Sequence, residues 1–415
     1  MKKYLLFSLL SFYALAVSSQ HKCATHQHLT HSCEKDPSRL ERLQAMEELA
    51  SRYKLEKKNR GDADITIPVV VHVLWNTPEQ NISDEQIFSQ IDVLNEDFRL
   101  ENFDAPDIDH PFWLESSDTY IEFCLAQQDE DGVATTGINR VWTPVNGWTE
   151  TNIAGIKQTS LGGQDNWDPQ FYLNIWVASF DASFSLLGYA TFPDDLETNP
   201  NEDGVVVRAN AFGDMGTATF PNDEGRTATH EVGHWLSLRH IWGDDYCGND
   251  FVDDTPVHFY SNYGCPDFPL NPFSECGTDE YGEMYMNYMD YVDDYCMNMF
   301  TFGQAERMWS AIENYRYGLL VSEGCQPGFP VSIEENQSMS FKTRLFPNPT
   351  SGELTVSFNS DQFAMIEFRN VLGDIVYKNT VYSGSVIDTS ELSAGTYIAS
   401  ILCDGKVEVT KIIVQ

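Results

Sequence analysis

Basic residues are scarce in this sequence of 415 residues, where 25 Lys and Arg face 63 Asp and Glu and give a formal net charge of −38. A surface field of that sign repels nucleic acid and anionic membranes, so neither is an expected partner. It attracts divalent metal ions and basic peptides, although the same charge would also simply keep an exported protein in solution. The length allows two or three domains, and a hydrophobic fraction of 42% is sufficient for packed cores.

Long apolar runs are equally scarce. The run at residues 4–17 follows Lys2 and Lys3, a pattern typical of a secretory signal peptide, which we expect over residues 1–19. This run is too short to span a bilayer permanently and no later run is long enough, so we expect no transmembrane segment. Nine cysteines fit a protein exported to an oxidising compartment, and four of them lie close together at 247–296, which predicts disulfides there.

Short-range patterns predict an α+β body with a twisted sheet over residues 61–325. A β-branched run at 66–75 indicates a strand, and apolar residues at the spacing of a buried helical face, preceded by a capping serine, indicate a helix over 83–98. Other elements are expected as strands at 120–125, 171–178 and 204–208, and as helices at 225–236 and 304–320. The Pro, Ser and Glu content of residues 326–340 predicts a linker after this body.

The segment HEVGHWLSLRH at residues 230–240 carries the decisive chemistry. Residues four apart on a helix lie one turn above each other, so His230 and His234 can direct two imidazole nitrogens at one tetrahedral zinc ion. His240, beyond the end of the helix, can supply a third ligand, and three protein ligands leave a position for water, as in catalytic zinc sites. Glu231 stands beside the first ligand, where it can take a proton from a zinc-bound water that attacks a substrate carbonyl.

The same segment resembles the extended zinc signature of the metzincin peptidases. Together with MNYMDY at 286–291 and ISDEQIFSQIDVLNEDFR at 82–99, it is similar to the pappalysin family, in particular its bacterial ulilysin-like branch. This resemblance implies a secreted zinc endopeptidase with a two-lobed catalytic domain and a cleft between the lobes. It also implies that Met289 is the Met-turn residue, an apolar floor beneath the zinc, and that Tyr291 stabilises the oxyanion of the intermediate.

One position departs from the family, which usually has Gly where this chain has Ser237. The chain has to turn sharply after the zinc-binding helix, and a non-Gly residue in the left-handed conformation costs roughly 1–2 kcal/mol. The ligand set is unaffected, so any difference from the family is expected in this turn.

The resemblance further implies a calcium ion in the loop after the zinc motif. Its ligands would be Asp250, Thr255 and the backbone carbonyl of Val252, since hard oxygen donors suit calcium. An acidic loop that simply faces water is the alternative. The resemblance also implies two disulfides where the sequence alone permits three pairings of four cysteines, namely Cys247–Cys276 and Cys265–Cys296. Three other cysteines have no assigned partner: Cys124, Cys325 and Cys403.

Substrate preference is implied by an aspartate near the Met-turn. In Arg-preferring members of the family, an aspartate three residues after the Met-turn tyrosine lies at the base of the pocket for the side chain on the C-terminal side of the cut bond. Asp294 stands at that offset from Tyr291. A confined carboxylate can pair two-pronged with a guanidinium, which predicts cleavage before Arg, including self-processing between Asn59 and Arg60. A solvated loop residue or a calcium ligand is the alternative for Asp294.

Residues 20–60 are polar, contain four of the ten histidines and end in a charged stretch, which predicts a removable pro-segment. A thiolate from this segment could occupy the open zinc position and keep the enzyme latent. Cys23 is favoured over Cys33 by its early place in the segment, and a carboxylate such as Asp36 is the alternative.

Residues 341–415 alternate in short apolar and polar runs between Gly and Asn-Pro turns, which predicts a small all-β sandwich. The strings LFPNPTSG at 345–352, LSAGTY at 392–397 and KIIV at 411–414 resemble a type IX secretion C-terminal sorting domain. This resemblance implies the type IX secretion machinery as a partner and export through the periplasm to the cell surface or beyond. A generic adhesive sandwich is the alternative.

Two other functions are compatible with the zinc motif. A surface adhesin could retain zinc only for structure, and a zinc amidase could act on cell-wall peptides instead of proteins. Loss of activity in Glu231→Ala with zinc retained would separate an enzyme from an adhesin, and cleavage of casein would argue against the amidase.

Overall fold

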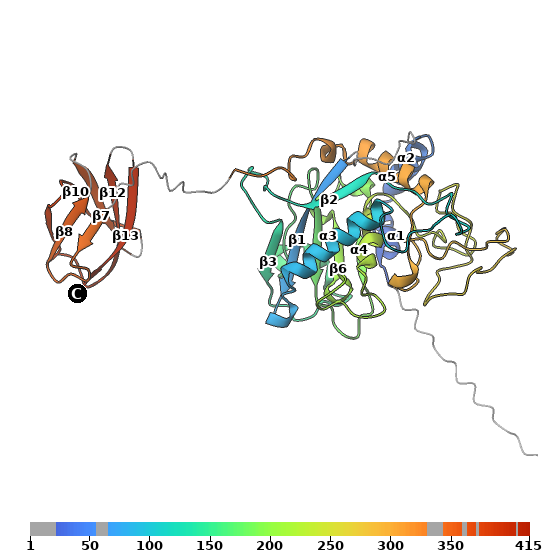
Figure 1. Ribbon diagram of the computed structural model, residues 1–415, viewed down its shortest axis with the longest axis horizontal. Helices are drawn as coiled ribbons and strands as arrows, with labels where there is room; N and C mark the ends of the chain where they lie inside the picture. Colours follow the sequence, from blue (N-terminus) through green and yellow to red (C-terminus); the bar gives the residue numbers. More distant parts are fainter. Residues whose placement is uncertain (1–21, 55–64, 330–342, 359–362, 371–372, 404–405) are drawn as a thin grey trace, which may run out of the picture. The chain divides into compact units, whose positions relative to one another are not determined.

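The structure is a computed structural model that describes residues 22–54, 65–329, 343–358, 363–370, 373–403 and 406–415. The expected signal peptide and the expected processing bond between Asn59 and Arg60 lie outside the described residues. The chain divides into two compact units, Met1–Pro330 and Val331–Gln415 (Figure 1). Within the described residues, no helix has both the length and the apolar character needed to cross a membrane.

The first unit is built on a six-stranded sheet of order β2-β1-β4-β6-β5, with β3 also paired to β1. All pairs are parallel except that of β5 with β6, and β5 forms an edge of the sheet. The strands are β1 (Ile65–Trp75), β2 (Ile121–Leu125), β3 (Ile138–Trp142), β4 (Leu173–Ala178), β5 (Gly188–Ala190) and β6 (Val205–Arg208). The mixed sheet agrees with the expected α+β class, while β3 and β5 are too short and too poorly alternating to be found in the sequence.

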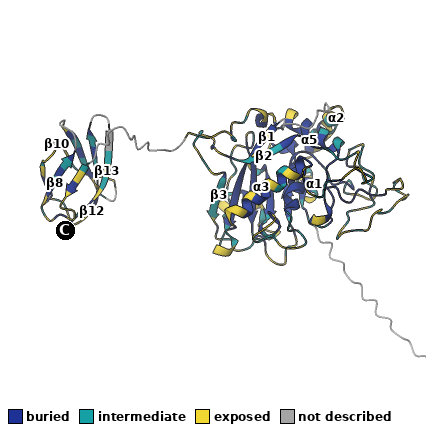
Figure 2. Cartoon of the chain, in the orientation of Figure 1, coloured by how far each residue is buried: buried dark blue, intermediate teal, exposed yellow. Residues whose placement is uncertain are grey.

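Both faces of this sheet are buried, which explains why β1 is a nearly continuous apolar run. Alternate β1 side chains such as Val69 and Val71 enter the main core with α3 (Asp84–Phe98) and α4 (Arg226–Trp235). On the opposite face, Leu74 packs in a second core that contains Trp148 and Trp176. Figure 2 shows the division within α3, which is buried toward the sheet and exposed on its outer side.

Helix α4 is buried along its whole length, and its C-terminal end is fixed by a buried arginine. Arg316 donates to both carboxylate oxygens of Asp203 at 3.0 and 2.8 Å and to the backbone carbonyl of Trp235 at 3.0 Å. Its guanidinium also lies 3.8 Å from the centre of the Trp235 ring. Ser237 then takes the left-handed conformation, with φ of 81°, and the Leu238 N–H donates to the carbonyl of Gly233 at 2.9 Å. The sharp turn is therefore kept without glycine, at the cost expected for a residue with a Cβ.

The segment after α4 is long and largely irregular up to α5 (Phe302–Asn314). Two disulfides cross-link it, Cys247–Cys276 and Cys265–Cys296, which are the pairs implied by the family resemblance. A third disulfide joins Cys124 of β2 to Cys325, two cysteines whose pairing the sequence left open. The helix predicted over 304–320 is interrupted after α5 and continues as the short 3-10 helix η8 (Tyr317–Val321), which leaves Arg316 free to turn inward.

The described part of the expected pro-segment forms two helices that the sequence analysis did not predict, α1 (Thr25–Lys35) and α2 (Arg39–Ala50). They pack against the rest of the first unit through a small apolar cluster and through buried ion pairs rather than through a broad apolar face. Arg39 binds Asp194 and Asp195, and Glu47 accepts hydrogen bonds from Arg239 and Arg307. These partners lie far away in the sequence, so local patterns could not reveal the docking.

The second unit consists of two antiparallel sheets of order β10-β9-β12-β13 and β11-β8-β7, packed around their own core. Its strands are β7 (Thr343–Phe346), β8 (Glu353–Phe358), β9 (Ala364–Arg369), β10 (Ile375–Val381), β11 (Val386–Asp388), β12 (Gly395–Cys403) and β13 (Lys406–Val414). The predicted all-β sandwich is present. Cys403 is buried in this unit.

Candidate active site

Three histidine side chains meet in the first unit at the position predicted from their spacing. His230 and His234 lie one turn apart on α4, and His240 reaches them from beyond the turn at Ser237. The Nε2 atom of His234 lies 3.1 Å from the Nε2 atoms of both His230 and His240. The three ring nitrogens therefore face one common point.

The opposite ring nitrogen of each histidine has an acceptor of its own. Nδ1 of His230 donates to the carbonyl of Tyr288 at 2.7 Å, and Nδ1 of His234 donates to the carbonyl of Leu238 at 2.8 Å. Nδ1 of His240 donates to Oδ1 of Asp244 at 2.6 Å. With each proton held on Nδ1, the lone pairs of all three Nε2 atoms point inward.

This donor set fits zinc. A tetrahedral ion with Zn–N bonds of about 2.0–2.1 Å separates its nitrogen ligands by roughly 3.3 Å, close to the spacing of these Nε2 atoms. Burial, with the neighbouring His240, lowers the pKa of His230 to about 3 and that of His234 well below its ordinary value, so both rings are the neutral species that binds a metal. The Sγ atom of Cys23 belongs to the same group, whose ligand atoms all lie within 4.8 Å of one another.

Glu231 lies beside this group and is 1% exposed. Its Oε2 accepts hydrogen bonds from the Thr25 hydroxyl at 3.1 Å and from the Cys23 thiol at 3.4 Å. Burial raises the pKa of Glu231 to about 8. Gly188 of β5 allows this arrangement, because a Cβ there would come within 2.8 Å of the Glu231 Cγ atom.

Met289 and Tyr291 both lie next to the histidine group. Met289 is fully buried, and its sulfur lies so close to α4 that a Cβ on Gly233 would approach it to 2.6 Å. The Tyr291 hydroxyl lies 3.0 Å from Nε2 of His240 and donates to the backbone carbonyl of Cys23 at 3.2 Å. The phenol is thus at the metal group, and in this form of the chain it contacts the pro-segment.

Asp294 begins the short 3-10 helix η7 (Asp294–Cys296) and is 2% exposed. Its Oδ2 accepts the backbone N–H groups of Glu224 at 3.1 Å and Arg226 at 3.2 Å, at the start of α4. Burial raises the pKa of Asp294 to about 7. The residue lines a pocket with His230, Glu231 and Tyr291, and its burial shows that it is not a solvated loop residue.

The calcium candidates form a separate group within the described residues. The Thr255 hydroxyl lies 2.8 Å from Oδ2 of Asp250 and 2.9 Å from the carbonyl oxygen of Val252. Burial raises the pKa of Asp250 to about 7.

Asp244 is the part of the site that the sequence analysis missed. It orients His240, and Nδ1 of the pro-segment residue His26 lies 3.0 Å from its other carboxylate oxygen. Burial alone would raise the pKa of Asp244, but His240 and His26 hold it well below its usual range. The sequence offered one signal, an acidic residue four positions after His240. The left-handed backbone conformation of Asp244, with φ of 60°, directs its carboxylate back to the His240 ring.

The site combines a mixed sheet with a wholly buried helix that carries two of three converging histidines. This combination defines the class of the protein, which is a metallopeptidase of the metzincin type. Residues 157–313 match the family described as pregnancy-associated plasma protein-A, and residues 344–415 match the secretion system C-terminal sorting domain. The chain belongs to this family of metalloendopeptidases, the pappalysins, and the family implies zinc as the metal.

Relatives support the assignment to this peptidase family. An extracellular metalloprotease of Arthroderma benhamiae is 30% identical over 271 residues, which cover 63% of this chain and 76% of that protein. Mature mirolysin of Tannerella forsythia, solved with a cleaved peptide, is 47% identical with a TM-score of 0.59 and covers 63% of this chain and 97% of its own.

A promirolysin mutant of Tannerella forsythia is 41% identical with a TM-score of 0.64 and covers 72% of this chain and 97% of its own. The larger share of this chain matched by the proenzyme indicates that the protein is made as a zymogen. The C-terminal sorting domain indicates a protein that is secreted or held at the cell surface.

Proposed function

We propose that the protein is a latent endopeptidase in which His230, His234 and His240 hold zinc and Glu231 is the general base. The observation that carries this proposal is the convergence of three inward-facing Nε2 atoms, with that of His234 3.1 Å from each of the others, beside the buried carboxylate of Glu231. Zinc, when bound, supplies a Lewis acid that polarises a carbonyl and lowers the pKa of water.

The residues of the chain supply the proton transfers and the positioning. Glu231 takes a proton from the attacking water onto its carboxylate and later gives that proton to the leaving amine. Tyr291 has its hydroxyl at the metal group, so it can donate a hydrogen bond to the oxygen that becomes negative in the transition state. Met289 packs its sulfur against α4 at Gly233. Family membership favours this activity over a structural zinc adhesin or a cell-wall amidase.

Latency is proposed to depend on Cys23. The Sγ atom of this residue lies among the three histidines, and the thiol is 2% exposed. A thiolate at that place would fill the fourth ligand position of the zinc. Asp36, the carboxylate alternative, is bonded instead to Ser38 and Arg42 on the outer side of the pro-segment, which supports Cys23 as the blocking residue.

Cleavage before Arg is proposed from the pocket that contains Asp294. This pocket opens beside Glu231 and His230, and its buried carboxylate can meet a cationic side chain. The net charge of −38 adds a long-range attraction for basic peptides.

A calcium site is proposed at Asp250, Val252 and Thr255. Its support is that the Thr255 hydroxyl lies within 3 Å of both the Asp250 carboxylate and the Val252 carbonyl, and that Asp250 is buried. A bound cation would offset the cost of an ionised carboxylate there. An ion at this place would strengthen the loop that follows the zinc motif.

The domain limits are likewise a proposal: a signal peptide at 1–19, a pro-segment at 20–60, a catalytic domain at 61–325, a linker at 326–340 and a sorting domain at 341–415. The two compact units and the matched ranges are compatible with this division.

Glu231→Ala is expected to lower the kcat of the processed enzyme on casein by about 10²–10⁴-fold, because the proton transfers lose their carrier. Zinc content, measured by atomic absorption, should stay at one ion per chain. Glu85→Ala, a change on the exposed side of α3, is the matched control and should keep full activity. Casein cleavage by Glu231→Ala at the wild-type rate would contradict the proposal.

Cys23→Ala is expected to shorten the time the precursor needs to become active by at least about tenfold, because the metal loses its blocking ligand. Cys33→Ala, in the same pro-segment but outside the metal group, should behave as wild type. A Cys23→Ala precursor as latent as the wild type would show that the thiol is not the block.

Asp294→Asn is expected to remove most of the preference for Arg in a peptide-library profile, while the amide keeps the hydrogen bonds from the start of α4. Zinc content and thermal stability check that the site is intact, and Asp267→Ala, an exposed change in the loop, is the control. The idea is wrong if the wild-type profile shows no enrichment of Arg after the cut bond.

Calcium added to protein depleted by a resin too weak to remove zinc is expected to raise the Tm of the wild type, because the ion binds only the folded state. Asp250→Asn should show little or no such increase. Equal Tm values of the wild type with and without calcium would count against the site.

A further inference from the structure

We infer that Lys22 is a pseudo-substrate residue. The pro-segment fills the specificity pocket with the cationic side chain of Lys22, and Asn222, Asp293 and the Val292 carbonyl are the groups that hold a cation there. This inference names the regulation of the proposed active site and rests on the proposed function.

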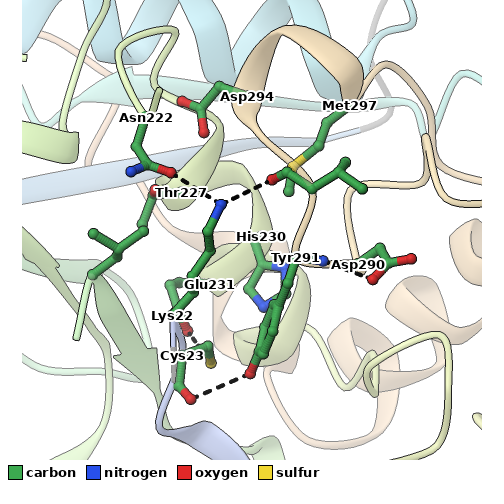
Figure 3. Close-up of a pocket in the computed structure, with 12 residues that line it drawn as sticks. Lys22, Cys23, Asn222, Thr227, His230, Glu231, Asp290, Tyr291, Asp294 and Met297 are labelled. Atoms are coloured by element: carbon green, nitrogen blue, oxygen red, sulfur yellow. Dashed lines mark hydrogen bonds between the residues drawn. The ribbon is translucent and has the colours of Figure 1, made fainter. Parts of the chain in front are cut away.

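The side chain of Lys22 extends along the pocket that opens beside Glu231 (Figure 3). Its Nζ atom lies 3.2 Å from Oδ1 of Asp293, 3.3 Å from the carbonyl oxygen of Val292 and 3.4 Å from Oδ1 of Asn222. An ammonium group has three donors, and these three acceptors use all of them. The end of the pocket is therefore a complete cradle for a primary ammonium group.

The backbone holds Lys22 at this depth by adding the pro-segment to the sheet edge. The carbonyl of Lys22 accepts the Leu187 N–H at 2.8 Å, and the Ala24 N–H donates to the carbonyl of Gly188 at 3.2 Å. Cys23 thereby forms a parallel bridge with Gly188 of β5. One short extended stretch thus places the thiol at the metal group and the preceding side chain in the pocket.

The direction of the chain explains why this stretch can block without being cut. In cleavage before Arg, the residue in the pocket follows the residue at the metal. Here Lys22 occupies the pocket and precedes Cys23, so the pro-segment runs through the cleft in the opposite direction to a substrate. It presents the Cys23 thiol, and not a correctly oriented carbonyl, to Glu231.

The two neighbouring aspartates have different tasks in this arrangement. Oδ2 of Asp294 is already used by two backbone N–H groups and helps to fix the start of α4. Asp293 instead directs Oδ1 at the Lys22 ammonium, and its side chain is 16% exposed. Asp293 and Asn222 are therefore specificity-determining residues in addition to Asp294.

The test uses the full chain with Glu231→Ala, so that no variant can process itself. The readout is the rate at which a maleimide labels Cys23, followed by mass spectrometry of the Cys23 peptide, because labelling requires the pro-segment to open. Lys22→Met keeps the apolar stem and removes the charge. We expect it to raise the labelling rate about tenfold, the effect of losing hydrogen bonds to a charged group. Asp293→Asn should have a similar effect.

The double variant Lys22→Met with Asp293→Asn should label no more than about twofold faster than either single variant, because both changes remove the same interaction. Lys22→Arg should stay near the parent rate, since the cation is kept. Lys35→Met removes a lysine on the exposed side of α1 and is the matched control, with no change expected.

Labelling of Lys22→Met at the parent rate, or fully multiplicative effects of the two changes, would overturn the inference. Neither result depends on peptidase activity. Failure of the proposed function would show separately, as retained casein cleavage in the processed Glu231→Ala enzyme.

Discussion

The active site depends on the fixed position of α4 (Arg226–Trp235). A two-residue shift of this helix would separate His230 from His240 and move Glu231 away from the metal group. Every residue of the helix is buried, so its position has to be fixed by contacts inside the protein. Its two ends are held by buried arginines. Arg226 binds Asp104 and the Asp294 carbonyl at the start, and Arg316 joins the last carbonyl of the helix to Asp203. Removing one partner of such a buried pair leaves an uncompensated charge, at a cost of about 3–5 kcal/mol, so the helix has one stable position.

The pro-segment occupies the active site through the kinds of contact that a substrate would make. It adds a short extended stretch to the edge strand β5, fills the specificity pocket with a cation and presents a soft ligand to the metal group. Away from the cleft, α1 and α2 are held chiefly by charged pairs, Arg39 with Asp194 and Glu47 with Arg307. Charged pairs can hold the pro-segment in place. When the pro-segment is removed, they leave little apolar surface exposed on the folded enzyme.

Acidic residues outside the active site and carboxylates inside it have different roles. Most of the 63 acidic residues lie outside the active site, where they give a field that attracts cations in general. Within the cleft, the described carboxylates are few and each has a partner that fixes its direction, such as His240 for Asp244 and the Lys22 ammonium for Asp293. Local geometry, and not overall charge, therefore fixes the directions of the carboxylates in the site.

The sequence by itself determined the features that depend on short-range spacing. The 3.6-residue period of a helix places His230 and His234 on one face, and the β-branched run at 66–75 indicates the strand that became β1. The motif around Met289 and Tyr291 was found by resemblance for the same reason, since it is contiguous. Only the tertiary structure decided what depends on distant partners. Cys124 meets Cys325 across 201 residues, Lys22 meets Asp293 across 271, and Asp244 turns back to His240 because its backbone is left-handed. No local period encodes such contacts, because they exist only once the sheet, the disulfide-linked loop and the pro-segment have packed together.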